Sequence, residues 1–471
     1  MCERSKQQQG LKAPLGINTK SSSPCECRDG VHRFRKIRKE RYQLLRTARA
    51  IYAKAGEKEG YEYVLNYHKT AKCAYASHSD VLVHVSTEYH KALLSGVIAC
   101  GRVHTCPVCG AKIEERRRLE IAKGVDFWYG LENKTVSMLT FTFSHSLGER
   151  LEDVLNKQAD ALERLRAGKA WTKFKTVFGF DSLIRSLEVT WGEENGWHPH
   201  THELWCVDKE IDRDRLAVYL KARFRAKRHA DRLERLLAAD PKAVFEELLL
   251  ERWEECCERA GLMIKQDGTE VNRDAFRKRA LDVRHDVSVG DYLAKQDDSR
   301  HWGVDREMSK GSTKLGKKKG MHPFGFLAKF AETGDGVWAA RWLEYSEAIG
   351  NKRRLFWSHG LKKRVGLDEK TDEEIAAEQD DHAVVVYQMV DDEWKKARHN
   401  VPRVLSAAED DENLREVIEQ IEELDYFALG DSDQMRDDRR QVSLKNSLLD
   451  DSPTLLSDAE LAEFKRTLEG F

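Results

Sequence analysis

The chain of 471 residues has few prolines and glycines and no long apolar run. Its 8 prolines and 30 glycines are too few for a collagen-like or low-complexity protein. No run of about eighteen apolar residues occurs, so no transmembrane helix is expected. The N-terminus has no apolar stretch behind its charges, so we expect no secretory signal peptide. Hydrophobic residues make up 40% of the chain, enough for two or three domains. We therefore expect a globular protein of the cytoplasm without a membrane partner.

The charge is close to balanced over the whole chain but not along it. Residues 401–471 contain 19 acidic and 8 basic residues, a balance of −11. Because the whole chain carries −1, the other 400 residues carry +10. A basic amphipathic pattern over residues 33–54 and the run Arg116–Arg118 suit contact with phosphates, although residues 33–54 could equally form an ordinary surface helix. A basic body with an acidic tail is typical of a nucleic-acid-binding protein.

Alternation and helical periodicity predict an α+β fold with an antiparallel sheet. Strands are expected at 135–143, 184–191, 197–207 and 280–287, and helices at 33–54, 150–176, 209–262 and 336–349. The predicted organisation is a flexible leader (1–30), a basic helix and zinc-binding module (31–130), a catalytic domain (131–300) with a helical insertion (209–280), a basic part of the catalytic region (301–367) and an acidic helical tail (368–471).

Four of the 10 cysteines form a pattern that is typical of a zinc site. The turn Cys106-Pro-Val-Cys109 presents two thiolates to one tetrahedral ion, and Cys100 supplies a third sulfur. Cys73 is the preferred fourth ligand, with His104 as the alternative. Cytoplasmic thiols stay reduced, so metal ligation or simple burial explains these residues better than disulfides do. We predict structural zinc at this cluster.

A second cluster is predicted on the hairpin Trp197-His198-Pro199-His200-Thr201-His202. Side chains alternate along a strand, so His200 and His202 point the same way. If the turn Gly192–Gly196 is centred on Glu194, Glu188 lies opposite His200. The spacing therefore predicts a two-histidine, one-carboxylate site for Mg²⁺ or Mn²⁺ with open positions. His198 is a weaker candidate because Pro199 disturbs the register.

A tyrosine and a lysine further along the chain add a nucleophile. In Ser288-Val-Gly-Asp291-Tyr292-Leu-Ala-Lys295, Ser288 and Asp291 fit a capping box that opens a helix. Tyr292 and Lys295 then share a helical face. A tyrosine oxygen beside a cation and a metal can attack a phosphate, since both offset the charge that develops on the phosphate oxygens.

Taken in order, these motifs resemble a known family. The strand Met138–Phe143, the pair His200 and His202, and Tyr292-x-x-Lys295 together resemble the rolling-circle replication initiators of small plasmids, within the HUH endonuclease superfamily. The resemblance covers about residues 73–365. It implies a palm-like antiparallel sheet with packed helices. An N-terminal zinc-binding module and a helical C-terminal region complete the expected fold.

The resemblance also implies an activity. Tyr292 would nick a single-stranded or hairpin origin of replication, giving a 5′-phosphotyrosine and a 3′-hydroxyl that primes synthesis, with Mg²⁺ or Mn²⁺ on His200 and His202. Host helicase and polymerase would be partners. One position departs from the family, which often has a water-activating glutamate four residues before the tyrosine; here it is Ser288. Asp286 and Asp291 are the nearby carboxylates.

Two other functions fit the sequence less well. Metallohydrolases of the metallo-β-lactamase type add Asp-His after His-x-His-x-His, whereas Glu203 and Leu204 follow here. The remaining alternative is a non-catalytic, zinc-containing DNA-binding protein. It leaves the joint pattern of Glu188, His200, His202 and Tyr292 without an explanation.

Overall fold

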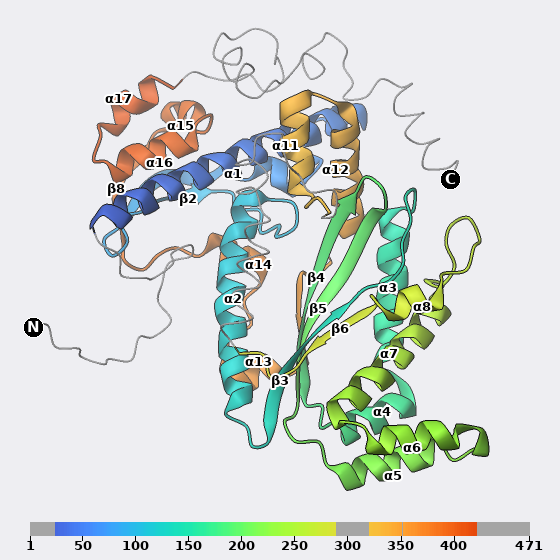
Figure 1. Ribbon diagram of the computed structural model, residues 1–471. Coiled ribbons are helices and arrows are strands. Elements are labelled where there is room, and N and C mark those ends of the chain that lie inside the picture. The colour runs from blue at the N-terminus through green and yellow to red at the C-terminus, as the bar shows by residue number, and fades with distance from the viewer. Residues whose placement is uncertain (1–23, 289–319, 351, 422–471) are drawn as a thin grey trace, which may run out of the picture.

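The computed structural model describes residues 24–288, 320–350 and 352–421, and its centre is a five-stranded antiparallel sheet (Figure 1). The strand order is β6-β3-β5-β4-β7. The strands are β3 (Lys134–Phe141), β4 (Ser182–Gly192), β5 (Gly196–Asp208), β6 (Leu281–Arg284) and β7 (Leu355–Trp357). The four predicted strands correspond to β3, β4, β5 and β6. The mixed fold with an antiparallel sheet and packed helices is thus confirmed, while the assignment to an HUH palm stays a prediction.

The long β4–β5 hairpin sets the register of the sheet. Gly192 pairs with Gly196, and Gly196 has a φ of +70°, a conformation that favours glycine. Because side chains alternate along each strand, this turn fixes every residue pair below it. Glu188 lies opposite His200, as the sequence predicted.

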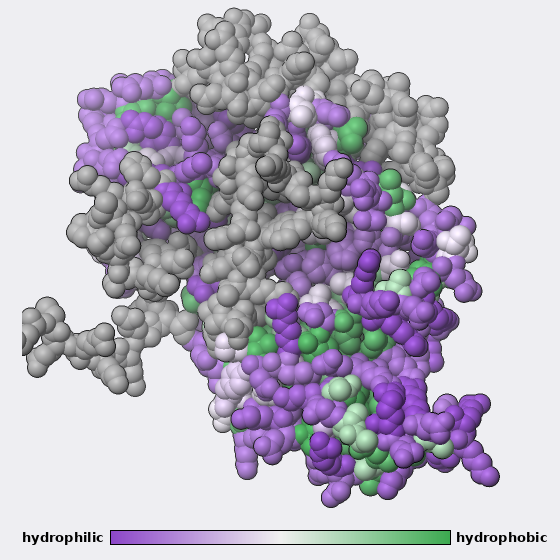
Figure 2. All heavy atoms as spheres, viewed as in Figure 1, coloured by the Kyte–Doolittle hydropathy of each residue, from purple (hydrophilic) through white to green (hydrophobic). Residues whose placement is uncertain are grey.

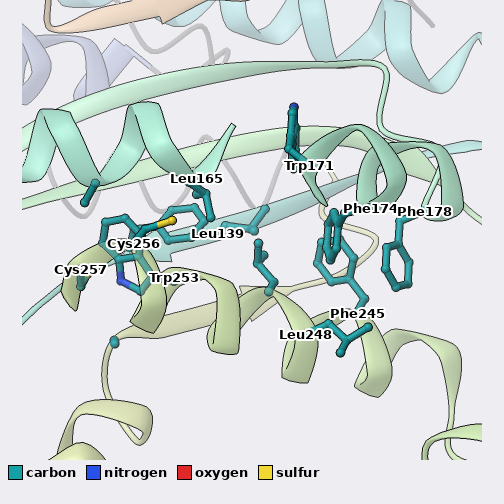
Figure 3. Packing of buried hydrophobic residues seen from close by; sticks show 14 of the residues in the cluster. Leu139, Leu165, Trp171, Phe174, Phe178, Phe245, Leu248, Trp253, Cys256 and Cys257 are labelled. Carbon is teal, nitrogen blue, oxygen red and sulfur yellow. The ribbon is translucent and has the colours of Figure 1, made fainter. Parts of the chain in front are cut away.

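Helices α3 (Leu151–Leu165), α4 (Gly168–Val177), α5 (Arg213–Arg223) and α7 (Pro241–Arg259) cover one face of the sheet. Their apolar residues recur at helical spacing and pack against Leu139, Phe141 and Trp205. Figure 3 shows this core, in which Phe174 and Phe178 meet Phe245. The short helices α6 (Ala230–Ala238) and α8 (Arg273–Arg277) complete the predicted helical insertion.

On the other face, α2 (Pro107–Tyr129) covers the half of the sheet that lies away from the hairpin turn. Ile121 and Trp128 of α2 pack against Leu204 and Cys206 of β5. Residues 200 and 202 have the same parity as 204 and 206, so both histidines face this side of the sheet. The short helix α13 (Leu361–Val365) packs here as well.

A second sheet, which the sequence did not predict, joins the two ends of the described chain. Its order is β2-β1-β8, with β1 (Ser77–Ser86), β2 (Ala92–Val97) and β8 (Ala383–Met389). Helices α15 (Asp391–Ala397), α16 (Val401–Glu409) and α17 (Leu414–Glu419) share an apolar core with this sheet. Helix α14 (Asp372–Ala377) packs against α2 instead. The C-terminal region was expected to be helical throughout, but it contributes the strand β8. The predicted domain boundaries stay a prediction.

The basic helix predicted at 33–54 is part of α1 (Pro24–Lys58), and it is a core helix rather than a surface one. Leu44, Ala48 and Ile51 are buried against α11 (Phe324–Thr333) and α12 (Gly336–Ile349). Arg35 forms ion pairs with Glu409 and Asp410. Arg38 forms an ion pair with Glu409. These arginines therefore stabilise the contact with the C-terminal region.

The described surface carries no sign of a membrane span. Within residues 24–288, 320–350 and 352–421, none of the helices is both long and apolar enough to cross a bilayer. Figure 2 shows hydrophilic side chains over most of the described surface on one side, with small groups of apolar residues between them. The cytoplasmic location stays a prediction.

Candidate metal centres

Glu188, His200 and His202 form one cluster on the face of the sheet that α2 leaves open. Nε2 of His200 lies 3.3 Å from Oε2 of Glu188, and Nε2 of His202 lies 3.5 Å from the same oxygen. Ligands around one ion with bonds of about 2.1 Å are separated by about 3 Å, so the three atoms fit one metal. Their side chains are 13–25% exposed, so solvent or substrate can reach the cluster.

The hydrogen bonds of His200 indicate that a cation belongs between these groups. Nδ1 of His200 lies 3.3 Å from the carbonyl oxygen of His198, which can only accept a hydrogen bond. Nδ1 therefore carries the hydrogen, and Nε2 of a neutral His200 turns its lone pair toward the carboxylate of Glu188. Two acceptors at 3.3 Å repel each other unless the imidazole is protonated or a metal lies between them.

The carboxylate of Glu188 is held in its ionised form. Burial alone would raise the pKa of Glu188, but His200 and His202, when their Nε2 atoms carry hydrogen, donate hydrogen bonds that outweigh burial and place this pKa well below its usual range. Ionised carboxylate and imidazole are the donors that Mg²⁺, Mn²⁺ and other borderline metals accept. The donor set is therefore suited to a divalent metal.

Residues beyond the three candidate ligands orient the imidazoles. Oγ1 of Thr140, opposite His202 on β3, lies 2.9 Å from Nδ1 of His202. His198 hydrogen-bonds to His145, whose Nδ1 lies 2.7 Å from the carbonyl oxygen of Asn195. Burial, followed by the neighbouring imidazoles, lowers the pKa of His198 to about 3, so His198 is neutral at physiological pH. His198 lies outside the three-residue cluster.

The four cysteines of the predicted zinc site also meet. The Sγ atom of Cys73 lies 3.4 Å from that of Cys109 and 3.6 Å from that of Cys106, and Cys100 lies 3.8 Å from Cys109. A tetrahedral ion with bonds of about 2.3 Å separates its sulfurs by about 3.8 Å. Burial raises the pKa of Cys106 well above its usual value, whereas hydrogen bonds within the cluster lower the pKa of Cys109, so without a cation the four thiols are not all ionised together. The cluster fits zinc.

Neighbouring elements fix this cluster in place. Cys106 caps α2, and its sulfur accepts a hydrogen bond from the backbone N–H of Cys109. The guanidinium of Arg49 donates to the carbonyl oxygen of Cys73. His104, the alternative fourth ligand, instead lies with Nε2 at 3.1 Å from the carbonyl oxygen of Lys352. The fourth position in the cluster is therefore that of Cys73.

The arginines after the cysteine cluster are paired inside the protein. Arg117 bonds to Glu120 and Asp372, and Arg118 bonds to Glu115. Arg116 lies 4.0 Å from Glu120. The pair Arg117–Asp372 links α2 to the start of α14, so the run contributes to folding rather than standing free for the phosphate contact that the sequence suggested.

Tyr292 and Lys295 lie outside the described residues, as does Asp291, but the chain that leads to them is described. Val287 donates its N–H to the carbonyl oxygen of Val136 and packs beside α2, on the face of the sheet that carries the histidines. Asp286 forms an ion pair with Lys242 at 2.6 Å, and this contact, followed by the hydrogen bond from Thr135, lowers the pKa of Asp286. A carboxylate stabilised in this way is a weak general base.

Thr140 and His145 are site residues that the sequence did not single out. Thr140 could have been found from the pairing of β3 with β5, because it lies directly opposite His202. His145 follows the end of β3 in a loop, and no periodic pattern predicts where a loop side chain points.

Comparisons with known proteins place these clusters in context. Residues 91–223 match a family model described as a replication protein, and this range includes the three residues of the open cluster and three of the four cysteines. The chain is 24% identical over 317 residues to a Streptomyces lividans protein named Protein rep, covering 59% of this chain and 66% of the relative. It is 31% identical over 140 residues to a Streptomyces cyanogenus protein named Neomycin resistance protein, covering 25% of this chain and 32% of the relative.

These alignments are partial. The chain spans slightly less than two thirds of the length of the first relative and about one third of the second. No solved structure matches the chain at a significant level.

Proposed function

We propose that this chain, whose residues 91–223 match the replication-protein model, is a replication initiator (Rep) of the plasmid type that its motifs resemble, and that it nicks DNA to start rolling-circle replication. The observation that carries the proposal is the cluster of Glu188, His200 and His202 inside the matched range. Its substrate is the origin of replication, as a single strand or an extruded hairpin, and host helicase and polymerase act after it. The reaction takes place in the cytoplasm.

In the proposed reaction, the hydroxyl oxygen of Tyr292 attacks the scissile phosphate. The bond from this oxygen to phosphorus forms as the bond from phosphorus to the 3′-oxygen breaks. The tyrosine loses its proton, and the departing 3′-oxygen gains one to become the primer hydroxyl. Because one phosphodiester replaces another, the reverse reaction rejoins the strand. Lys295 offsets negative charge on the phosphate oxygens.

The open cluster prepares the phosphate for this attack. Glu188, His200 and His202 would hold Mg²⁺ or Mn²⁺, which when bound polarises a phosphate oxygen as a Lewis acid. Thr140 orients His202, and the carbonyl of His198 orients His200, so both rings keep Nε2 available. The side chains of the cluster are partly exposed, so a phosphate can approach them from the surface.

The reach of the chain supports Tyr292 as the nucleophile. Val287 bonds to Val136, which pairs with Cys206 on β5. Cys206 lies four positions after His202 on β5, about 13 Å at the rise of a strand. Tyr292 lies five positions after Val287, and the chain between them spans at most about 17 Å. The tyrosine can therefore reach the metal ligands from the same face of the sheet.

The cysteine cluster takes a structural role in this proposal. Cys73, Cys100, Cys106 and Cys109 would hold one Zn²⁺, which joins the start of α2 to the segment before β1. All four donors are sulfurs and all four side chains are buried, so no position remains for a substrate.

The test is covalent attachment to DNA. The purified chain is incubated with Mn²⁺ and labelled oligonucleotides that tile the DNA flanking its gene, and the products are separated on a denaturing SDS gel. We expect one oligonucleotide to give a protein–DNA adduct, and Tyr292→Phe to remove the adduct while leaving DNA binding nearly unchanged. A chain that binds these DNAs but never forms the adduct would be the non-catalytic zinc-containing DNA-binding protein instead.

A further inference from the structure

Helix α4 presents a surface of one charge sign. Trp171, Phe174 and Val177 of this helix face the core. Its exposed lysines are Lys169, Lys173 and Lys175. The helix contains no acidic residue. Its outer face also carries no exposed aromatic or large aliphatic side chain.

The end of α5 continues this surface. Lys221, Arg225 and Lys227 are exposed there. Phe174 of α4 and Phe224 at the end of α5 belong to the same apolar core, and Figure 1 shows the two helices beside each other at one end of the sheet. We call the six exposed cations of α4 and of residues 221–227 the basic surface.

The basic surface differs from the neighbouring helices, whose charges are paired. Arg232 of α6 forms ion pairs with Glu247 and Glu251 of α7. Arg235 of α6 forms an ion pair with Glu247. In contrast, none of the six cations of the basic surface has an acidic partner within ion-pair distance among the residues that the structure describes. Like charges kept together without counter-charges attract anions.

We propose that the basic surface binds the phosphates of duplex DNA without reading its sequence, which gives the initiator a second contact with its replicon. Lysine and arginine bind phosphates through charge and release counterions, and this contribution is independent of sequence. A single-strand binding surface would need exposed aromatic rings for stacking, and the aromatic rings of α4 are buried. A membrane-binding helix would need exposed apolar residues, which the outer face of α4 does not have.

The position of the surface separates it from the nicking site. Helix α4 packs on the face of the sheet opposite to that of His200 and His202. Asp208, at the end of β5, lies six positions after His202, about 20 Å along the strand. A duplex on the basic surface therefore leaves the metal cluster free. This assignment rests on the proposed function, because it takes DNA as the anionic partner.

The test measures duplex binding without cleavage. Fluorescence anisotropy of a labelled 24-base-pair duplex of mixed sequence is recorded with the full chain in EDTA-free buffer containing Ca²⁺, over a series of salt concentrations. Two double variants are tested. The first combines Lys173→Gln with Lys175→Gln, and the second combines Lys221→Gln with Lys227→Gln. The control pair, Lys265→Gln with Lys278→Gln, removes the same charge from exposed lysines elsewhere.

We expect each test pair to weaken duplex binding at least about tenfold at low salt and to flatten the plot of log K against log salt by about two. The control pair should leave both nearly unchanged, and adduct formation on single-stranded origin DNA should persist in all variants. Equal duplex affinity in the test and control pairs would overturn the assignment. Binding to acidic lipid vesicles is measured for the same variants, and test pairs that lose vesicle binding but keep duplex binding would also overturn it. Absence of the adduct in the unmodified chain would instead overturn the nicking function and leave the binding result standing.

Discussion

The two candidate metal clusters of this chain differ in ligand number, ligand type and burial. Cys73, Cys100, Cys106 and Cys109 supply four sulfurs that are at most 5% exposed. The other cluster supplies one carboxylate and two imidazoles that are 13–25% exposed. Closed four-ligand sites are typical of structural metals, and sites with three protein ligands leave a position for a reactant. The difference supports the proposal that the first cluster serves folding and the second serves chemistry.

The two clusters are also built differently. The cysteines come from a 3-10 helix end, a loop and the start of α2, and a bound ion would join these segments. Glu188, His200 and His202 lie on paired strands whose register the hairpin turn sets. Removal of a metal should therefore disorder the first region and leave the second folded. The following predictions test this contrast.

The largest effect is expected at the cysteine cluster. Cys106→Ser should lose the bound zinc and a large part of the stability, because structural zinc contributes on the order of 10 kcal/mol to the folding of its module. The matched control is Cys256→Ser, a buried cysteine outside the cluster, which should cost only about 1–3 kcal/mol. Thermal unfolding and zinc content measure both. Similar melting temperatures for the two variants would contradict a structural zinc site.

At the open cluster the same kind of change should affect chemistry and not folding. His202→Ala should lower the nicking rate at least about 100-fold, since even partners of metal ligands contribute 10–100-fold. Its melting temperature should stay within a few degrees of that of the unmodified chain. His359→Ala, at an exposed histidine outside the cluster, is the control. Loss of folded protein in His202→Ala alone would give this cluster a structural role as well.

The contact behind the metal should have a smaller effect. Thr140→Val keeps the shape of the side chain but removes the hydrogen bond to Nδ1 of His202. We expect Mn²⁺ to bind about 10–100-fold more weakly, with nicking restored at high Mn²⁺. Thr142→Val, two residues along the same chain, is the control because Thr142 bonds to the carbonyl oxygen of Arg279. Nicking that does not recover at saturating Mn²⁺ would show that Thr140 acts in another way.

The smallest effect is expected on the lifetime of the covalent adduct. A serine hydroxyl at Ser288 is a poor general base near neutral pH, so water should release the phosphotyrosine slowly. Ser288→Glu should speed this release about tenfold, because a carboxylate can activate water. Asp286→Asn should change release little, since Asp286 is paired with Lys242. Rapid release by the unmodified chain that is lost in Asp286→Asn would identify Asp286 as the base.

Local patterns predicted the open cluster well. Alternation along β5 and a short turn with a glycine at each end were sufficient to place Glu188 opposite His200. The cysteine spacing likewise predicted the sulfurs that the structure brings together, with Cys73 in the fourth position. Both inferences depend on residues that are close in the sequence or on a register that one turn determines.

Contacts between residues far apart in the chain could not be predicted from the sequence. The strand β8 pairs with β1, and Gln388 bonds to Asp80 across 308 residues of chain. No local periodicity specifies a partner at that distance. The same limit explains Arg38 and Arg117, whose acidic partners Glu409 and Asp372 lie far along the chain. A basic run read alone suggested DNA contact, whereas the fold uses these charges internally.

Selective removal of metal tests the division of roles most directly. The purified chain is treated briefly with EDTA, and zinc content, melting temperature and covalent adduct formation are measured before and after Mn²⁺ is added back. We predict that about one zinc per chain and the melting temperature are retained, while adduct formation is lost and then restored by Mn²⁺. Adduct formation that continues at full rate in EDTA, with zinc still bound, would contradict a metal role for Glu188, His200 and His202.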